Sequence, residues 1–283
     1  MKLVCIHGRG QGKFPAEELR MKWRDSWLAG LRKSGIEQLP EVEFVFPFYG
    51  DILDELTRQL KASAKRKGDL GHTDEEYVPE LMWELAMNGG ISEKEIDATE
   101  EIKKAFQNQQ WVIDLARKID EKYGAGFCLS LALPDAYTYL TESIIQEQID
   151  ELVKLEIGTK PCVVVGHSLG SAVGFNIINQ DASLNVQTFV TLGSPLGMKT
   201  FHHYLPFCPR YPLGLKGDWY NAFDKRDIVA LRSLDQEYFK VEGRIENYEE
   251  VDNFTKNRHS IEGYLSDKQV ALKIYDALLN CKR

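Results

Sequence analysis

The chain has few of the features that would assign it to nucleic acids or membranes. Its net charge is −8, from 35 basic and 43 acidic residues, and it contains no basic tract of the kind that follows a phosphate backbone. The longest apolar run, FCLSLALP at 127–134, is too short to span a bilayer. Strand-like residues follow Met1 directly and leave no room for a signal peptide. We therefore expect no nucleic-acid partner and no transmembrane segment.

The cysteines also lack a pattern. None of the five stands in a CxxC spacing, and Cys5 and Cys162 lie inside apolar runs, where a thiol usually acts as a small buried hydrophobe. The interpretation of all of them as reduced favours a cytoplasmic location. The five are Cys5, Cys128, Cys162, Cys208 and Cys281.

What is present is an alternation of apolar strands and amphipathic helices. The strands read as continuous apolar runs, which is typical of sheets covered on both faces. The pattern predicts an α/β fold with a mostly parallel, doubly wound sheet in a single domain, 1–283. The expected strands are 3–6, 42–48, 162–167, 186–193 and 218–223, and the expected helices are 14–35, 141–158 (with a Thr cap and a Gly stop), 169–180 and 264–280.

The stretch 51–124 differs from the rest. It is charged, has helical periodicity and contains no convincing strand, so we expect a helical cap inserted into the domain. The adjoining segment GFCLSLALPDAYTYL (126–140) could line an acyl-binding wall together with Leu196 and Met198. The same residues could equally pack the cap on the core.

The motif GHSLG at 166–170 lies where an apolar strand, CVVV, meets a helical run. Such a turn is so tight that its central residue takes a strained backbone conformation, and glycines two before and two after it avoid clashes. The serine hydroxyl is then held at the N-terminus of the next helix, where negative charge is favoured. Ser168 is therefore the candidate nucleophile.

A serine needs a base to remove its proton, and histidine suits this role. In hydrolases with this strand–turn–helix arrangement the chain order is Ser, acid, His. Three histidines follow Ser168. His259 comes late, just before the final helix, whereas His202 and His203 come before any plausible acid and read as loop or pocket-rim residues. His259 is the predicted base.

For the acid, the segment WYNAFDKRDIVA offers two carboxylates just past a strand. Asp227 is preferred because the apolar pair after it can anchor the loop, and Asp224 beside a lysine can be a solvated turn residue. Asp224 stays open as an alternative, and Asp218 and Asp235 are weaker candidates.

The glycine-rich loop in VCIHGRGQGKF, residues 4–14, fails as a nucleotide site. Only three residues separate Gly8 from Gly12, one fewer than a P-loop needs, and Phe14 stands where it needs Ser or Thr. A dinucleotide fingerprint needs its third glycine where Lys13 stands. No cofactor and no metal is expected.

The loop fits better as part of a site that binds an oxyanion. A tetrahedral oxyanion takes one backbone N–H from the residue after the nucleophile and one from a loop after an early strand. We assign these donors to Leu169 and Arg9. Glycines around Arg9 would let the backbone approach the substrate oxygen closely.

Together these segments resemble the α/β-hydrolase superfamily, on its lipase-like side. CIHGRGQG, VVVGHSLGS, TLGSPLG, NAFDKRDIV and a histidine before the last helix occur in that order, over residues 3–280. The resemblance implies Ser168, Asp227 and His259 as triad and Arg9 and Leu169 as oxyanion donors. The early first strand and the early insertion depart from larger members.

The expected function is a serine hydrolase that cleaves a small-molecule or lipid carboxylic ester through an acyl-enzyme. An acyltransferase, a thioesterase or an amidase would use the same triad. A hydrolase fold kept as a non-catalytic binding or signalling module is a further alternative, although such proteins usually lack a triad member.

Overall fold

A computed structural model describes residues 1–67, 74–91, 119, 134–205 and 209–281. Within these residues the strands form one six-stranded, wholly parallel sheet of order β2-β1-β3-β4-β5-β6. The predicted parallel α/β sheet is therefore confirmed. The strands are β1 (Lys2–Ile6), β2 (Glu43–Val45), β3 (Cys162–His167), β4 (Val186–Leu192), β5 (Leu215–Ala222) and β6 (Ile245–Tyr248).

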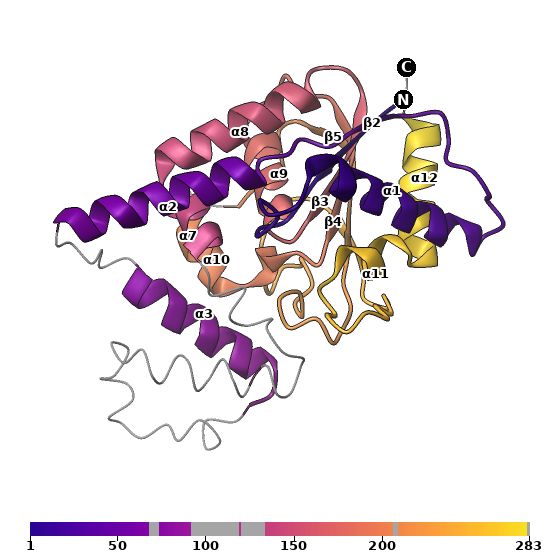
Figure 1. The fold of residues 1–283 in the computed structure, drawn as a ribbon. Coiled ribbons are helices and arrows are strands. Elements are labelled where there is room, and N and C mark those ends of the chain that lie inside the picture. The colour runs from indigo at the N-terminus through magenta and orange to yellow at the C-terminus, as the bar shows by residue number, and fades with distance from the viewer. Residues whose placement is uncertain (68–73, 92–118, 120–133, 206–208, 282–283) are drawn as a thin grey trace.

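Helices cover both faces of this sheet (Figure 1). On one face α1 (Ala16–Arg32), α11 (Ile261–Leu265) and α12 (Lys268–Asn280) pack over an apolar cluster that includes Val163 and Val165. The other face carries a second cluster, with Val4 and Val164. Its helices are α2 (Gly50–Lys67), α3 (Asp74–Asn88), α7 (Pro134–Thr141), α8 (Ser143–Ile157), α9 (Leu169–Gln180) and α10 (Lys199–Tyr204), with a 3₁₀ turn η1 (Pro195–Gly197).

The strand order places two loops side by side. From β1 the chain moves outward to β2 and then returns past β1 to β3, so the direction of winding changes between β1 and β3. Ile6 at the end of β1 lies opposite Gly166 near the end of β3. In open parallel sheets such a switch point is where ligands bind. The glycine-rich loop and the Ser168 turn therefore meet at one edge of the sheet.

Several boundaries differ from the prediction. β2 is three residues long, and β6 was not predicted because IENY has neither an apolar run nor a regular alternation of apolar and polar residues. The last helical segment is two helices, and the Asp267 carboxylate caps the second by accepting from the N–H groups of Gln269 and Val270.

Of the two predicted ends of the helix 141–158, only the C-terminal end is confirmed. Gly158 ends α8 with φ 61°, as expected for a glycine stop. The predicted Thr141 cap was wrong: Thr141 is the last residue of α7, and Glu142 occupies the N-cap position of α8 without a side-chain cap.

The described part of the stretch 51–124 consists mainly of α2 and α3. Buried side chains from both helices, among them Leu53 and Leu85, belong to the same apolar cluster as the sheet. The Glu84 carboxylate of α3 accepts from the N–H groups of Lys199 and Thr200 at the start of α10. Residues 92–118 and 120–133 lie outside the described residues, so the cap stays a prediction.

The two side chains proposed for an acyl-binding wall, Leu196 and Met198, are buried within the same cluster and pack the core. Most of the segment 126–140, up to residue 133, lies outside the described residues. In the described helices, none is long and apolar enough to cross a membrane.

Candidate active site

Ser168 stands at the corner between β3 and α9 with a backbone conformation of φ 53° and ψ −128°. Among the described residues it is the only non-glycine with positive φ. A residue with a Cβ tolerates this region only where the surrounding structure enforces it, and such strain is concentrated at functional sites. The corner presents the Ser168 side chain just beyond the carboxyl end of the sheet.

The two glycines of GHSLG are required by close packing. A Cβ on Gly166 would stand 2.7 Å from the Gly170 carbonyl oxygen and 2.7 Å from the Ser171 Cα. A Cβ on Gly170 would overlap the carbonyl oxygens of Ile6 and His7. Since these are backbone atoms, they cannot move aside, which confirms the reason given for glycine at both positions.

The three residues predicted as a triad converge. His259 Nε2 lies 2.7 Å from Ser168 Oγ, and His259 Nδ1 lies 2.7 Å from Asp227 Oδ2. An ionised carboxylate can only accept, so the Nδ1 proton faces Asp227 and Nε2 accepts from the serine hydroxyl. Ser168 is 5% exposed, His259 9% and Asp227 1%, so all three lie largely out of water.

Asp227 is held by its own turn and by a neighbouring helix. Its Oδ1 accepts from the Val229 N–H at 3.1 Å, and its Oδ2 accepts from the Tyr264 hydroxyl at 2.6 Å. Ile228 and Val229 are both buried, as expected for an apolar pair that anchors the loop.

Asp224, the alternative acid, bonds elsewhere. Its carboxylate accepts from the Arg226 guanidinium and from the Asn253 N–H, and these bonds hold the pKa of Asp224 below its usual range although burial acts against them. It therefore joins the Asp227 turn to the segment before His259.

The remaining sequence candidates lie apart from this arrangement. Asp218 is part of β5, and Asp235 closes a turn by accepting from the N–H groups of Glu237 and Tyr238. His202 and His203 lie in α10 rather than in a loop, and the His202 ring bonds the Leu196 carbonyl.

Two residues that sequence reasoning missed position the His259 backbone. The Asn253 amide donates to the carbonyls of Arg258 and Ser260, on either side of the histidine. His167 Nε2–H donates to the His259 carbonyl at 2.8 Å. Burial, followed by the neighbouring His259, lowers the pKa of His167 well below its usual value, so this ring stays neutral. Neither role has a local sequence signal.

The glycine-rich loop lies against the nucleophile. A Cβ on Gly8 would stand 3.0 Å from Ser168 Cβ, tighter than ordinary contact, so the loop backbone passes directly beside the serine. His7 holds it there: its Nε2 accepts from the Tyr49 N–H at 3.2 Å, which leaves an Nδ1 proton that donates to the Gly8 carbonyl at 2.6 Å. Burial lowers the pKa of His7 to about 4, so His7 is neutral as well.

Both predicted oxyanion donors are in this region. Leu169 is the first residue of α9, and such residues have no N–H acceptor one turn back in their own helix. Arg9 follows Gly8 in the loop that flanks Ser168. The corner thus combines a hydroxyl, an imidazole, a carboxylate and a helix N-terminus.

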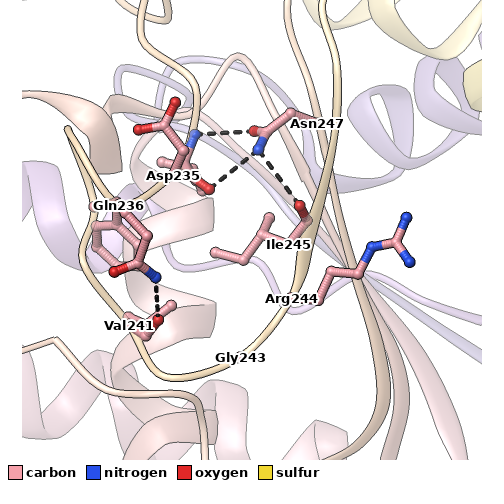
Figure 2. Close-up of a pocket in the computed structure, with 9 residues that line it drawn as sticks. Asp235, Gln236, Val241, Gly243, Arg244, Ile245 and Asn247 are labelled. Atoms are coloured by element: carbon pink, nitrogen blue, oxygen red, sulfur yellow. Dashed lines mark hydrogen bonds between the residues drawn. The ribbon is translucent and has the colours of Figure 1, made fainter.

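A hollow beside β6 is a separate feature (Figure 2). Two of its polar side chains are bonded within the protein: the Asn247 side chain accepts from the Leu234 N–H and donates to the Leu234 carbonyl, and the Gln236 amide donates to the Val241 carbonyl.

Among the described residues, no group of three or more His, Cys, Asp or Glu side chains could hold a metal ion. The described cysteines, Cys5, Cys162 and Cys281, are free and buried, and Cys128 and Cys208 lie outside the described residues.

Comparison of the chain with known proteins gives no match to a family model, to a curated protein or to a solved structure. The functional assignment therefore depends on the geometry of the site.

Proposed function

We propose that this protein is a serine hydrolase that cleaves a carboxylic ester through an acyl-enzyme on Ser168. One observation carries the proposal: Ser168 Oγ, His259 and Asp227 form a continuous hydrogen-bonded series with both distances at 2.7 Å, at a strained strand–helix corner. Nucleophile, base and orienting carboxylate are the three parts that acyl transfer by serine requires.

In the proposed reaction His259 Nε2 takes the hydroxyl proton as Ser168 Oγ attacks the ester carbonyl, and Asp227 stabilises the imidazolium that forms. The imidazolium then returns the proton to the leaving alcohol, which leaves the acyl group on Ser168. Water, deprotonated by the same imidazole, hydrolyses the acyl-enzyme and restores the free serine.

The negative charge on the tetrahedral oxygen would be held by the N–H groups of Leu169 and Arg9. Support comes from the α9 N-terminus at Leu169 and from the approach of Gly8 to Ser168. Loss of one such donor typically costs about 3 kcal/mol of transition-state stabilisation.

We assign the chain to the α/β-hydrolase superfamily as part of this proposal. The parallel sheet, the order Ser168, Asp227, His259 along the chain and the packed glycines of the corner all support it. The cap over 51–124, a small-molecule or lipid ester as substrate and a cytoplasmic location belong to the same proposal. The free thiols are compatible with a reducing compartment.

The proposal is tested with a fluorophosphonate probe, which forms a covalent bond only with an activated serine. We expect stoichiometric labelling of the wild type, none of Ser168→Ala, and unchanged labelling of Ser183→Ala, an exposed serine away from the site. Labelling that survives Ser168→Ala would overturn the nucleophile assignment.

Substrate class is tested with p-nitrophenyl esters of increasing chain length. An optimum at long acyl chains supports a lipase-like enzyme, and an optimum at acetate or butyrate supports a small esterase. A labelled protein that turns over no ester, thioester or amide would contradict the hydrolase proposal.

A further inference from the structure

Tyr264 of α11 makes a contact that the proposed mechanism does not use. Its hydroxyl lies 2.6 Å from Asp227 Oδ2, the same oxygen that His259 Nδ1 approaches at 2.7 Å. One carboxylate oxygen thus receives two hydrogen bonds, one from the base and one from a phenol. Tyr264 follows His259 by only five residues, so one short segment brings both donors to Asp227.

The direction of the phenol hydrogen bond is determined by its neighbours. The Asp224 N–H donates to the Tyr264 oxygen at 3.3 Å, and the remaining phenol hydrogen points to Asp227. Burial, followed by the nearby Asp227 charge, raises the pKa of Tyr264 well above its usual value, so the hydroxyl stays protonated and remains a donor.

Little space exists for another partner of Asp227. Gly193, the residue after β4, has φ 55°, and a Cβ there would stand 3.2 Å from Asp227 Oδ2, 3.2 Å from His259 Nδ1 and 3.1 Å from the Tyr264 ring. Asp227 is 1% exposed and Tyr264 is fully buried, so the Tyr264 hydroxyl bonds the carboxylate away from bulk water.

We propose that Tyr264 is a positioning residue that fixes Asp227 and lowers the basicity of His259 through the shared oxygen. The inference rests on the proposed function, in which His259 is the base. A donor to Oδ2 withdraws charge from the carboxylate, so the carboxylate attracts the imidazolium less strongly. The base is thereby kept neutral, and able to accept the serine proton, to a lower pH.

The other groups that face His259 do not supply this effect. The His167 ring, 4.9 Å away between centroids, is neutral, and the Ser168 hydroxyl is a neutral donor to Nε2. The Arg258 guanidinium donates to the Asn253 carbonyl, and that of Arg226 bonds the carboxylates of Asp224 and Asp252.

The decisive variant is Tyr264→Phe, which keeps the ring and removes only the hydroxyl. We expect kcat to fall by about tenfold with KM within about twofold, and the acid limb of the pH–kcat/KM profile to move up by about half a pH unit to one unit. Tyr220→Phe, in a buried tyrosine of the same apolar cluster, should leave both unchanged. Loss of activity without movement of the acid limb would make Tyr264 merely structural and overturn the inference.

Two further measurements distinguish the positioning role of Tyr264 at Asp227 from other consequences of the substitution. In an Asp227→Asn background, Tyr264→Phe should have no additional effect on kcat, since its action passes through the carboxylate. If Tyr264→Phe folds poorly, 3-fluorotyrosine at position 264 keeps the hydroxyl and makes it a stronger donor, so the acid limb should move to lower pH. Movement in the other direction, or none, would overturn the inference.

The inference and the proposed function can fail separately. An NMR titration of the His259 ring needs no activity, and its midpoint should rise in Tyr264→Phe even if the protein hydrolyses nothing. Absence of fluorophosphonate labelling together with a raised midpoint would refute the enzyme and retain the role of Tyr264 at Asp227. Labelling with an unmoved midpoint would retain the enzyme and refute the inference.

Discussion

Two aspartates, the buried Asp227 in the turn after β5 and the partly buried Asp150 of α8, each accept a hydrogen bond from a tyrosine hydroxyl but differ in their other side-chain partner. Asp227 accepts from the Tyr264 hydroxyl at 2.6 Å, and Asp150 of α8 accepts from the Tyr139 hydroxyl at 2.7 Å. The second side-chain partner differs: for Asp227 it is the His259 imidazole, and for Asp150 it is the Asn176 amide.

The two partners differ in whether they can be protonated and become positively charged. An imidazole can accept a proton and become a cation beside the carboxylate, and an amide cannot. Burial of Asp150 therefore outweighs its two donors and raises its pKa to about 7. A buried carboxylate is useful in acid–base chemistry through its partner, and burial alone only makes the charge costly.

The largest expected effect separates the two carboxylates in activity. Asp227→Asn should lower kcat by about 10⁴-fold, because an amide no longer holds the Nδ1 tautomer of His259. Asp150→Asn should change kcat by less than about twofold. Steady-state hydrolysis of a p-nitrophenyl ester measures both, and a comparable loss in the two variants would break the comparison.

The next largest effect is the pH dependence that Asp150 gives to the free energy of unfolding. Between pH 3.8 and about 7, Asp150 is protonated in the folded chain and ionised in the unfolded one. In this range the folded chain therefore binds one proton more than the unfolded chain, at Asp150. The free energy of unfolding keeps its full value with respect to Asp150 below pH 3.8 and falls as the pH rises to about 7. The loss in the free energy of unfolding is at most about 4 kcal/mol.

Urea unfolding from pH 4 to pH 8 measures this dependence as the difference between the wild type and Asp150→Asn. The variant should lack that part of the slope. Equal slopes in both proteins would show that Asp150 titrates in its ordinary range when folded.

The smallest effect concerns the tyrosine donor of Asp150. Tyr139→Phe should lower the free energy of unfolding by about 1 kcal/mol, and more at pH 8 than at pH 5, because a hydrogen bond to an ionised carboxylate is the stronger one. Tyr275→Phe, on α12 at the opposite face of the sheet, is the control. A loss that is the same at both pH values would place the effect in packing instead.

Sequence reasoning was most successful where the signal was local. The strand at 162–167, the corner at Ser168 and the helix 169–180 were predicted with correct bounds, since an apolar run, a glycine pair and a buried helical run are contiguous. The short edge strand β6 was missed because its four residues, IENY, form neither an apolar run nor a regular alternation.

The residues of the candidate site also differ in how far the sequence alone identified them. Asp227 and His259 could be named from chain order and local context, but the choice between Asp227 and Asp224 depended on which carboxylate faces the imidazole. Tyr264, Asn253 and His167 could not be found, because their partners are distant in the sequence or are backbone atoms. His7 had no signal beyond its place beside the glycines.

The amino-acid sequence alone determined the parallel α/β architecture and the strand–serine–helix corner, because periodicity and steric restriction act between residues close in the chain. Only the tertiary structure decided which groups surround the Asp227 carboxylate and in what hydrogen-bonding state. Those contacts depend on how β3, the turn after β5 and the segment 253–264 meet at the edge of the sheet, and on the exclusion of water there.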